Sequence, residues 1–233
     1  TLSSSSAASD VYKRQGMTTL TEENYLKAIY HLTEKNQTVS VNELSKYLKI
    51  KMPSVNSMMK KFAEKNWVIY ETYKPLQITP EGRKRAALVV RKHRLTEMFL
   101  VDKMGFGWEQ VHEIAEQIEH IKSELFFEKI DELLDYPKTD PHGSPIPDKN
   151  GNIIKLNYLK LSECKPGQTV VFKALSESPN DLLNYLNQKK LSLKTAIEII
   201  FIEPFDKSIT VSYSGKQEIF SNLVCEKLLV EKA

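Results

Sequence analysis

The sequence has little cysteine and no long apolar run. Its two cysteines, Cys164 and Cys225, lie far apart and form no Cys-x-x-Cys pair. This excludes a thiolate zinc clasp and the disulfide frame of a small secreted domain. No apolar run approaches the roughly 18 residues that a membrane-spanning helix needs. These absences predict a cytoplasmic protein with no membrane segment.

The first sixteen residues also lack structural signals. Residues 1–16 are serine-rich, have no helical or strand period, and contain no apolar core of a secretory signal. We interpret them as a non-native or disordered leader before a native start at Met17.

Charge is unevenly distributed along the chain, although the net charge is only +3. Residues 17–92 contain 14 Lys and Arg against 7 Asp and Glu, a net of +7. Residues 93–137 contain 4 against 11, a net of −7. A basic block predicts an anionic partner such as nucleic acid, and an acidic block predicts a cationic ligand.

The basic block has the pattern of a winged helix-turn-helix. Capping residues and apolar spacing predict helices over 21–35, 41–48 and 53–66. Two strand-like runs, 67–70 and 76–78, enclose a polar turn. Three helices followed by a small hairpin are typical of a DNA-binding domain, here expected over 17–80.

Polar and basic residues of this block are the candidate DNA contacts, because small polar side chains reach base edges and lysines reach phosphates. Each of them could instead be solvated surface, and Met58, Met59 and Phe62 are expected in the core. The candidates are Lys49, Lys51, Pro53, Ser54, Asn56, Ser57, Lys60, Lys61, Tyr73 and Lys74.

Helical patterns continue through the acidic block. We expect helices over 79–104, from 108 to 120 or beyond, and over 123–134, forming a metal-binding and dimerisation domain over 81–140. A Pro- and Gly-rich linker follows over 141–158. Short strands over 169–172, 198–202, 208–213 and 217–220, with a helix over 180–188 between the first two, then predict a small SH3-like β-barrel over 159–233. The whole fold is expected to be multidomain and mainly α.

Six metal-competent side chains lie within the acidic block. His93 and Glu97 are four residues apart, and His112 is followed by Glu116, Glu119 and His120 at offsets of four, seven and eight. At about 100° per residue the second set occupies roughly one third of a helix circumference. Imidazole and carboxylate without thiolate favour a divalent first-row metal.

Two catalytic interpretations of the same residues are weaker. His112-Glu113-Ile114-Ala115-Glu116 approaches the His-Glu-x-x-His motif of zinc peptidases, but Glu116 stands where the second histidine is required. A carboxylate-bridged di-iron oxidase needs two Glu-x-x-His motifs, and this stretch does not have two. A metal site next to a DNA reader instead indicates a sensor, not an enzyme.

In its order of motifs the chain resembles the diphtheria toxin repressor and manganese transport regulator family of metal-dependent transcriptional repressors. The resemblance covers 21–233. It rests on Pro53-Ser54-Val55, on the run from Arg91 to Glu97, on Val111-His112 with Glu116, Glu119 and His120, and on the proline-bounded segment 141–147.

The resemblance implies two metal sites per subunit. His93, Glu97 and His112 would form an ancillary site, and Glu116, Glu119 and His120 a regulatory site with Asn24 from the first helix. Asn24 replaces the Met or Asp of other members, and Lys27 replaces a manganese-type carboxylate. Glu177 is the nearest candidate for a ligand from the SH3-like domain.

The resemblance further implies a homodimer that binds a palindromic operator in double-stranded DNA and represses metal-uptake genes. Glu116 stands where iron-type members have Cys, which favours Mn²⁺, whereas the ancillary triad is of the iron type. Manganese is therefore the expected metal and Fe²⁺ the alternative. A carboxylate- and histidine-based metalloenzyme is the alternative from another class.

Overall fold

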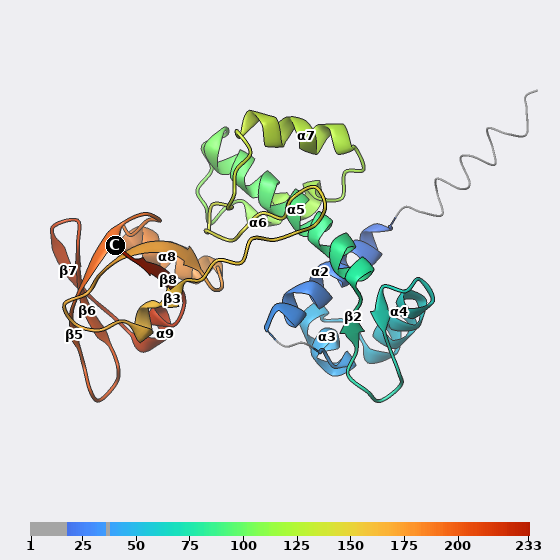
Figure 1. The fold of residues 1–233 in the computed structure, drawn as a ribbon, viewed down its shortest axis with the longest axis horizontal. Coiled ribbons are helices and arrows are strands. Elements are labelled where there is room, and N and C mark those ends of the chain that lie inside the picture. Colours follow the sequence, from blue (N-terminus) through green and yellow to red (C-terminus); the bar gives the residue numbers. More distant parts are fainter. Residues whose placement is uncertain (1–17, 36–37) are drawn as a thin grey trace, which may run out of the picture. The chain divides into compact units, whose positions relative to one another are not determined.

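A computed structural model describes residues 18–35 and 38–233; the predicted leader, 1–16, and Met17 lie outside this range. The chain divides into two compact units, the first comprising Thr1–Val90 with Lys149–Asn152 and the second Arg91–Asp148 with Ile153–Ala233 (Figure 1). Over the described residues, every helix is too short or too polar to cross a bilayer.

The first unit is built from three helices and a wing. The helices are α2 (Leu20–Lys35), α3 (Val41–Leu48) and α4 (Met52–Glu64). The wing consists of antiparallel β1 (Val68–Ile69) and β2 (Gln77–Ile78), extended by a bridge between Val39 and Leu76. This is the predicted arrangement of a winged helix-turn-helix.

Local signals determine where these helices begin and end. The Ser40 hydroxyl accepts from the backbone N–H of Glu43, and the Glu43 carboxylate accepts from that of Ser40, which is a capping box at the start of α3. Lys49 ends α3 in the left-handed region, with φ 55°. Leu26, Leu44 and Phe62 are fully buried between the helices. The recognition helix α4 is therefore held by a packed core.

A buried carboxylate joins the start of α2 to the end of α4. Glu22, 1% exposed, pairs with Lys65 Nζ at 2.5 Å and Lys61 Nζ at 3.0 Å. Burial alone would raise its pKa, but the hydrogen bonds from Lys65, the Thr19 N–H and Lys61 lower the pKa of Glu22 to about 2. The Glu22 carboxylate is thus ionised at neutral pH.

This lowered pKa predicts a pH-dependent stability. A carboxyl whose folded pKa lies below its unfolded value of 4.5 stabilises the fold above pH 4.5, and loses that contribution as the pH falls toward 2. We expect the ionised Glu22 carboxylate to add about 1–2 kcal/mol to the free energy of unfolding. This is less than the pKa shift alone implies, because both lysines are partly exposed and solvent weakens the ion pairs. Urea unfolding followed by Trp67 fluorescence in a Trp108→Phe background measures it.

In the Glu22→Gln variant, the free energy of unfolding should lack the decrease that this carboxylate causes between pH 5 and pH 2.5. Glu64→Gln, at an exposed carboxylate of α4, should keep that decrease. An unchanged pH profile in Glu22→Gln would show that the ion pairs do not stabilise the first unit.

The helical part of the second unit begins within α5 (Pro80–Asp102). The residues of α5 up to Val90 belong to the first unit, and those from Arg91 onward belong to the second. Next come α6 (His112–Ile118) and α7 (Glu124–Leu133). The helix predicted over 108–120 is shorter at both ends, because Trp108–Gln110 form a turn and the chain leaves the helix at Glu119. Glu119 is the C-cap of α6, and its backbone N–H still donates to the Ala115 carbonyl at 2.9 Å.

The C-terminal part of this unit is an open six-stranded sheet. Its strands are β3 (Leu159–Lys160), β4 (Thr169–Leu175), β5 (Ala196–Ile202), β6 (Ile209–Tyr213), β7 (Lys216–Phe220) and β8 (Leu228–Lys232). The order is β3-β8-β4-β5-β6-β7, so β3 and β7 are edges and the pairings do not close the predicted barrel. Helix α8 (Asn180–Gln188) lies where predicted, whereas β3, β8 and the short α9 (Asn222–Cys225) were not predicted. Helices and strands are thus mixed, not mainly α.

Candidate metal centre and DNA interface

Three predicted ligands converge between α5 and α6. His93 Nε2 lies 3.0 Å from Glu97 Oε1 and 3.2 Å from His112 Nδ1, and the last two atoms are 3.4 Å apart. Donors bound at right angles about 2.1 Å from one ion are roughly 3 Å apart. The triangle of these three atoms therefore has the dimensions of one face of an octahedral coordination sphere.

The second nitrogen of His93 connects this triad to the predicted regulatory residues. His93 Nδ1 lies 2.5 Å from Glu119 Oε2, and the Glu119 carboxylate is fully buried. A carboxylate at Nδ1 favours the tautomer whose Nε2 lone pair is available to a cation. Glu119 thus orients a ligand of the ancillary triad.

A second ligand group, which the sequence did not reveal, shares Glu97. It comprises Glu97, Asp140 and His142, all buried, with one donor atom of each within 4.8 Å of the others. His142 Nδ1 lies 3.7 Å from Glu97 Oε2. His142 Nε2 donates to the carbonyl oxygen of Trp108 at 2.9 Å, and Nδ1 lies toward the carboxylates of Glu97 and Asp140. Glu97 therefore offers one oxygen to each group.

The segment that contains Asp140 and His142 is fixed by the backbone and by α5. Asp140 Oδ1 accepts from the backbone N–H groups of His142 at 2.8 Å and Ser144 at 2.9 Å. Arg94 donates to the Pro145 carbonyl at 2.5 Å. Gly143 has φ +86°, and a Cβ there would lie 2.2 Å from the Lys173 carbonyl oxygen. These contacts hold Asp140 and His142 in place where the predicted linker begins.

Charge within the shared group favours a cation. Burial opposes ionisation of Glu97, but the adjacent imidazoles of His112 and His93 hold its pKa well below the usual range. Burial, followed by the negative charge of Glu97, raises the pKa of Asp140. Two buried carboxylates in mutual repulsion are the arrangement that a divalent ion relieves.

The predicted regulatory ligands are only partly brought together. His120 Nε2 lies 3.6 Å from Glu119 Oε1, whereas the exposed Glu116 lies 3.7 Å from His112 Nε2. Over the described residues, Glu116, Glu119 and His120 do not form a three-donor group. Asn24 lies on α2 in the first unit, and Glu177 pairs with Lys227 at 2.7 Å. Their roles as ligands stay predictions.

Because Glu97 belongs to both groups, we expect Glu97→Gln to lower Mn²⁺ affinity at least tenfold. Loss of a residue that only hydrogen-bonds a metal ligand already lowers affinity by about tenfold or more, and loss of a ligand itself should cost more. Calorimetric titration or the electron paramagnetic resonance signal of free Mn²⁺ measures the change. Glu113→Gln, at an exposed carboxylate of α6, the helix that carries His112, is the control. Equal affinities and stoichiometries of the two variants would remove Glu97 from the centre.

The candidate DNA contacts gather on α4, its preceding turn and the wing. Ser54, Ser57, Lys60 and Lys61 are exposed on α4, opposite the buried Met59 and Phe62. Lys49, Lys51 and Pro53 are exposed at and before its start. Tyr73 is fully exposed at the tip of the wing with φ 68°, and Lys74 pairs with Glu71 at 2.5 Å. Lys61 is also partly neutralised by Glu22.

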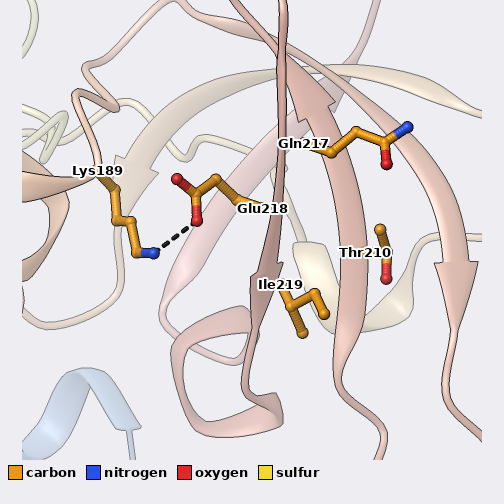
Figure 2. Close-up of a pocket in the computed structure, with 5 residues that line it drawn as sticks. All are labelled: Lys189, Thr210, Gln217, Glu218 and Ile219. Carbon is orange, nitrogen blue, oxygen red and sulfur yellow. Dashed lines mark hydrogen bonds and ion pairs between the residues drawn. The ribbon is translucent and has the colours of Figure 1, made fainter.

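A hollow on the C-terminal sheet lies apart from these residues. Lys189, Thr210, Gln217, Glu218 and Ile219 line it, and Figure 2 shows Lys189 directed at Glu218, 2.5 Å away. Its lining includes no His and only one carboxylate, which is already paired with a lysine. This hollow does not have the chemistry of the metal centre.

Three family models match successive parts of the chain. Residues 17–76 match the N-terminal DNA-binding domain of iron-dependent repressors. Residues 79–148 match the metal-binding and dimerisation domain of the same proteins. Residues 159–232 match the FeoA domain. The DNA reader and the metal centre thus occur in the order that the sequence predicted.

Individual relatives agree with these domains. The chain is 30% identical to the iron-dependent repressor IdeR of Mycobacterium leprae over 73% of its own length and 78% of the relative's. It is 28% identical to the diphtheria toxin repressor of Corynebacterium diphtheriae, over 84% of its own length and 90% of the relative's. A solved manganese-dependent transcriptional repressor in complex with manganese has a TM-score of 0.80 at 28% identity, covering 91% of this chain and 100% of that one. The chain belongs to the diphtheria toxin repressor family of metal-dependent transcriptional repressors, which are not enzymes.

Proposed function

We propose that this repressor responds to manganese, binds a palindromic operator as a homodimer and controls genes of metal uptake. The observation that carries the proposal is the convergence of His93, Glu97 and His112, with donor atoms 3.0–3.4 Å apart, in a chain that also has a DNA-binding domain. The same chain matches a dimerisation domain. Two heads of a symmetric dimer would read two half-sites related by the same symmetry.

The metal response would act through charge and linkage. When bound, a divalent cation supplies positive charge that several carboxylates and imidazoles share. The chain's own residues do the rest: Glu119 orients His93, and Glu97 serves both ligand groups. The acidic block 93–137, with its net charge of −7, would otherwise repel phosphate. If DNA favours the metal-loaded form, DNA must tighten metal binding by the same factor.

The choice of manganese rests on the donor atoms. No described cysteine lies near the centre, since Cys164 and Cys225 are buried within the C-terminal domain. Oxygen and imidazole donors suit Mn²⁺, but at a common site Fe²⁺ binds more tightly, so selectivity must come from the geometry that activates the protein. Fe²⁺ is the second candidate, because a relative named as an iron-dependent repressor matches 73% of the chain.

Substitutions of the predicted regulatory ligands should change the metal preference. Glu116→Cys introduces a soft thiolate and should shift activation toward Fe²⁺ or Co²⁺, whereas Asn24→Asp introduces a charged oxygen and should strengthen the Mn²⁺ response. The measurement is DNA affinity titrated with each metal under anaerobic conditions. A duplex selected by the wild-type protein from a randomised library in MnCl₂, here the selected duplex, is the probe.

The same titration tests the manganese assignment in the wild-type protein. Activation by Mn²⁺ at lower occupancy than by Fe²⁺ would support it. A response to Fe²⁺ without a response to Mn²⁺ at equal occupancy would overturn it in favour of iron. If Glu116→Cys leaves the order of metals unchanged, Glu116 is not a ligand.

A further inference from the structure

Tyr70 holds one side chain of the recognition helix in a fixed orientation. It directly follows β1, at the base of the wing, and its hydroxyl donates to Asn56 Oδ1 at 2.8 Å. Both side chains are partly buried. The contact therefore joins the wing to the second turn of α4, two parts of the DNA-binding domain that are expected to meet DNA.

The place of Asn56 on α4 makes it a flanking residue. At about 100° per residue, it lies roughly 100° from the buried Val55 and only about 40° from the exposed Lys60. Its side chain thus leaves the helix at the border between the core face and the face that carries Ser57 and Lys60. A residue at this border can contact DNA only if its side chain is turned outward.

The hydrogen bond determines which end of the amide is turned outward. Because Tyr70 donates to Oδ1, the Nδ2 hydrogens must find other acceptors. Over the described residues, no protein group is recorded as taking them, and no buried side-chain nitrogen or oxygen is left without a partner. Nδ2 is therefore open to solvent, as a donor.

We propose that Tyr70 is a positioning residue for sequence recognition: it presents Asn56 Nδ2 as a donor to one base-edge acceptor in the major groove. Guanine N7 and O6, thymine O4 and adenine N7 are such acceptors. A freely rotating asparagine would instead offer donor and acceptor alike. This inference rests on the DNA-binding role proposed for α4 and concerns specificity, not overall affinity.

The test compares base preferences of the full-length protein in MnCl₂, by selection from a randomised duplex library followed by sequencing. The variants are Asn56→Ala, Tyr70→Phe, their combination, and Tyr185→Phe as a matched loss of a hydroxyl in the C-terminal domain. Asn56→Ala should lose about tenfold preference at one base pair of each half-site, the size of one base contact. Tyr70→Phe should lose part of that preference, about threefold, at the same base pair.

In the double variant, Tyr70→Phe should add nothing to Asn56→Ala, and affinity for an unrelated duplex should stay within about twofold in every variant. Asn56→Asp should bind the selected duplex worse than Asn56→Ala, because a carboxylate cannot donate. Uniform weakening at all positions, an effect of Tyr70→Phe that persists without Asn56, or tighter binding by Asn56→Asp would each overturn the inference. If wild type selects no duplex, the proposed function fails instead.

Discussion

Replacement of His120 with alanine is expected to abolish metal-activated DNA binding. His120 lies against the buried carboxylate of Glu119, which in turn holds His93 of the ancillary triad. Its removal takes a nitrogen donor from the predicted regulatory site and an imidazole partner from the Glu119 carboxylate. We expect at least a hundredfold loss of affinity for the selected duplex at saturating Mn²⁺, since the response depends on the lost ligand.

The chain offers a matched control for this variant. Of its five histidines, His93, His112 and His142 belong to the candidate ligand groups and His120 to the predicted regulatory site, whereas His31, on α2, belongs to neither. His31→Ala should keep the metal response, and both variants should keep the oligomeric state of the wild type in sedimentation. A His120→Ala protein with an unchanged Mn²⁺ midpoint would show that the regulatory site is elsewhere.

DNA affinity is expected to fall steeply with salt. The block 17–92 carries a net charge of +7, and exposed lysines lie before and along α4. Neutralisation of about five phosphates gives a slope near −4.5 for the logarithm of affinity against the logarithm of salt concentration. Between 0.1 M and 0.4 M salt, affinity should therefore fall about 500-fold, as fluorescence anisotropy of a labelled duplex can measure.

Two neighbouring lysines provide an internal comparison. Lys60→Ala should reduce the slope by about 1 and weaken binding to all duplexes alike. Lys61→Ala should change the slope less, because Glu22 already balances part of the Lys61 charge at 3.0 Å. A slope near zero in the wild type, or a larger effect of Lys61→Ala than of Lys60→Ala, would contradict this electrostatic account.

Local signals made some elements predictable from the sequence. The ends of α3 are given by the Ser40–Glu43 capping box and by Lys49 in the left-handed region. The first helix, the wing and α8 likewise follow from short-range patterns of caps and apolar residues. His93 and Glu97 could be recognised as candidate ligands because they lie four residues apart on one helix, whereas the family resemblance grouped His112 with them.

Contacts between distant residues account for what was missed. The helix through His112 ends at Ile118, where the Glu119 carboxylate contacts His93 on α5, and helical periodicity does not report such a contact. Asp140 and His142 meet Glu97 only because Arg94 and a turn at Gly143 fix their segment. The Asp-x-His spacing beside prolines was the one local signal, and it was interpreted as the border of a linker.

The pairing of strands was also beyond local patterns. Residues 228–232 pair with β4, far away in the sequence, so β8 gains its place from tertiary packing. The open edges β3 and β7 depend on the same long-range pairings. Fold class was thus predictable at the level of domains, but the closure of the sheet was not.

The central claim is that metal occupancy controls DNA binding, and one titration tests it most directly. Full-length protein and labelled selected duplex are first equilibrated in excess chelator, MnCl₂ is then added, and anisotropy is followed before and after a second addition of chelator. The account predicts weak, salt-sensitive binding at the start, a rise of at least tenfold in affinity that saturates with Mn²⁺, and full reversal by chelator. Equal affinity with and without metal would contradict it.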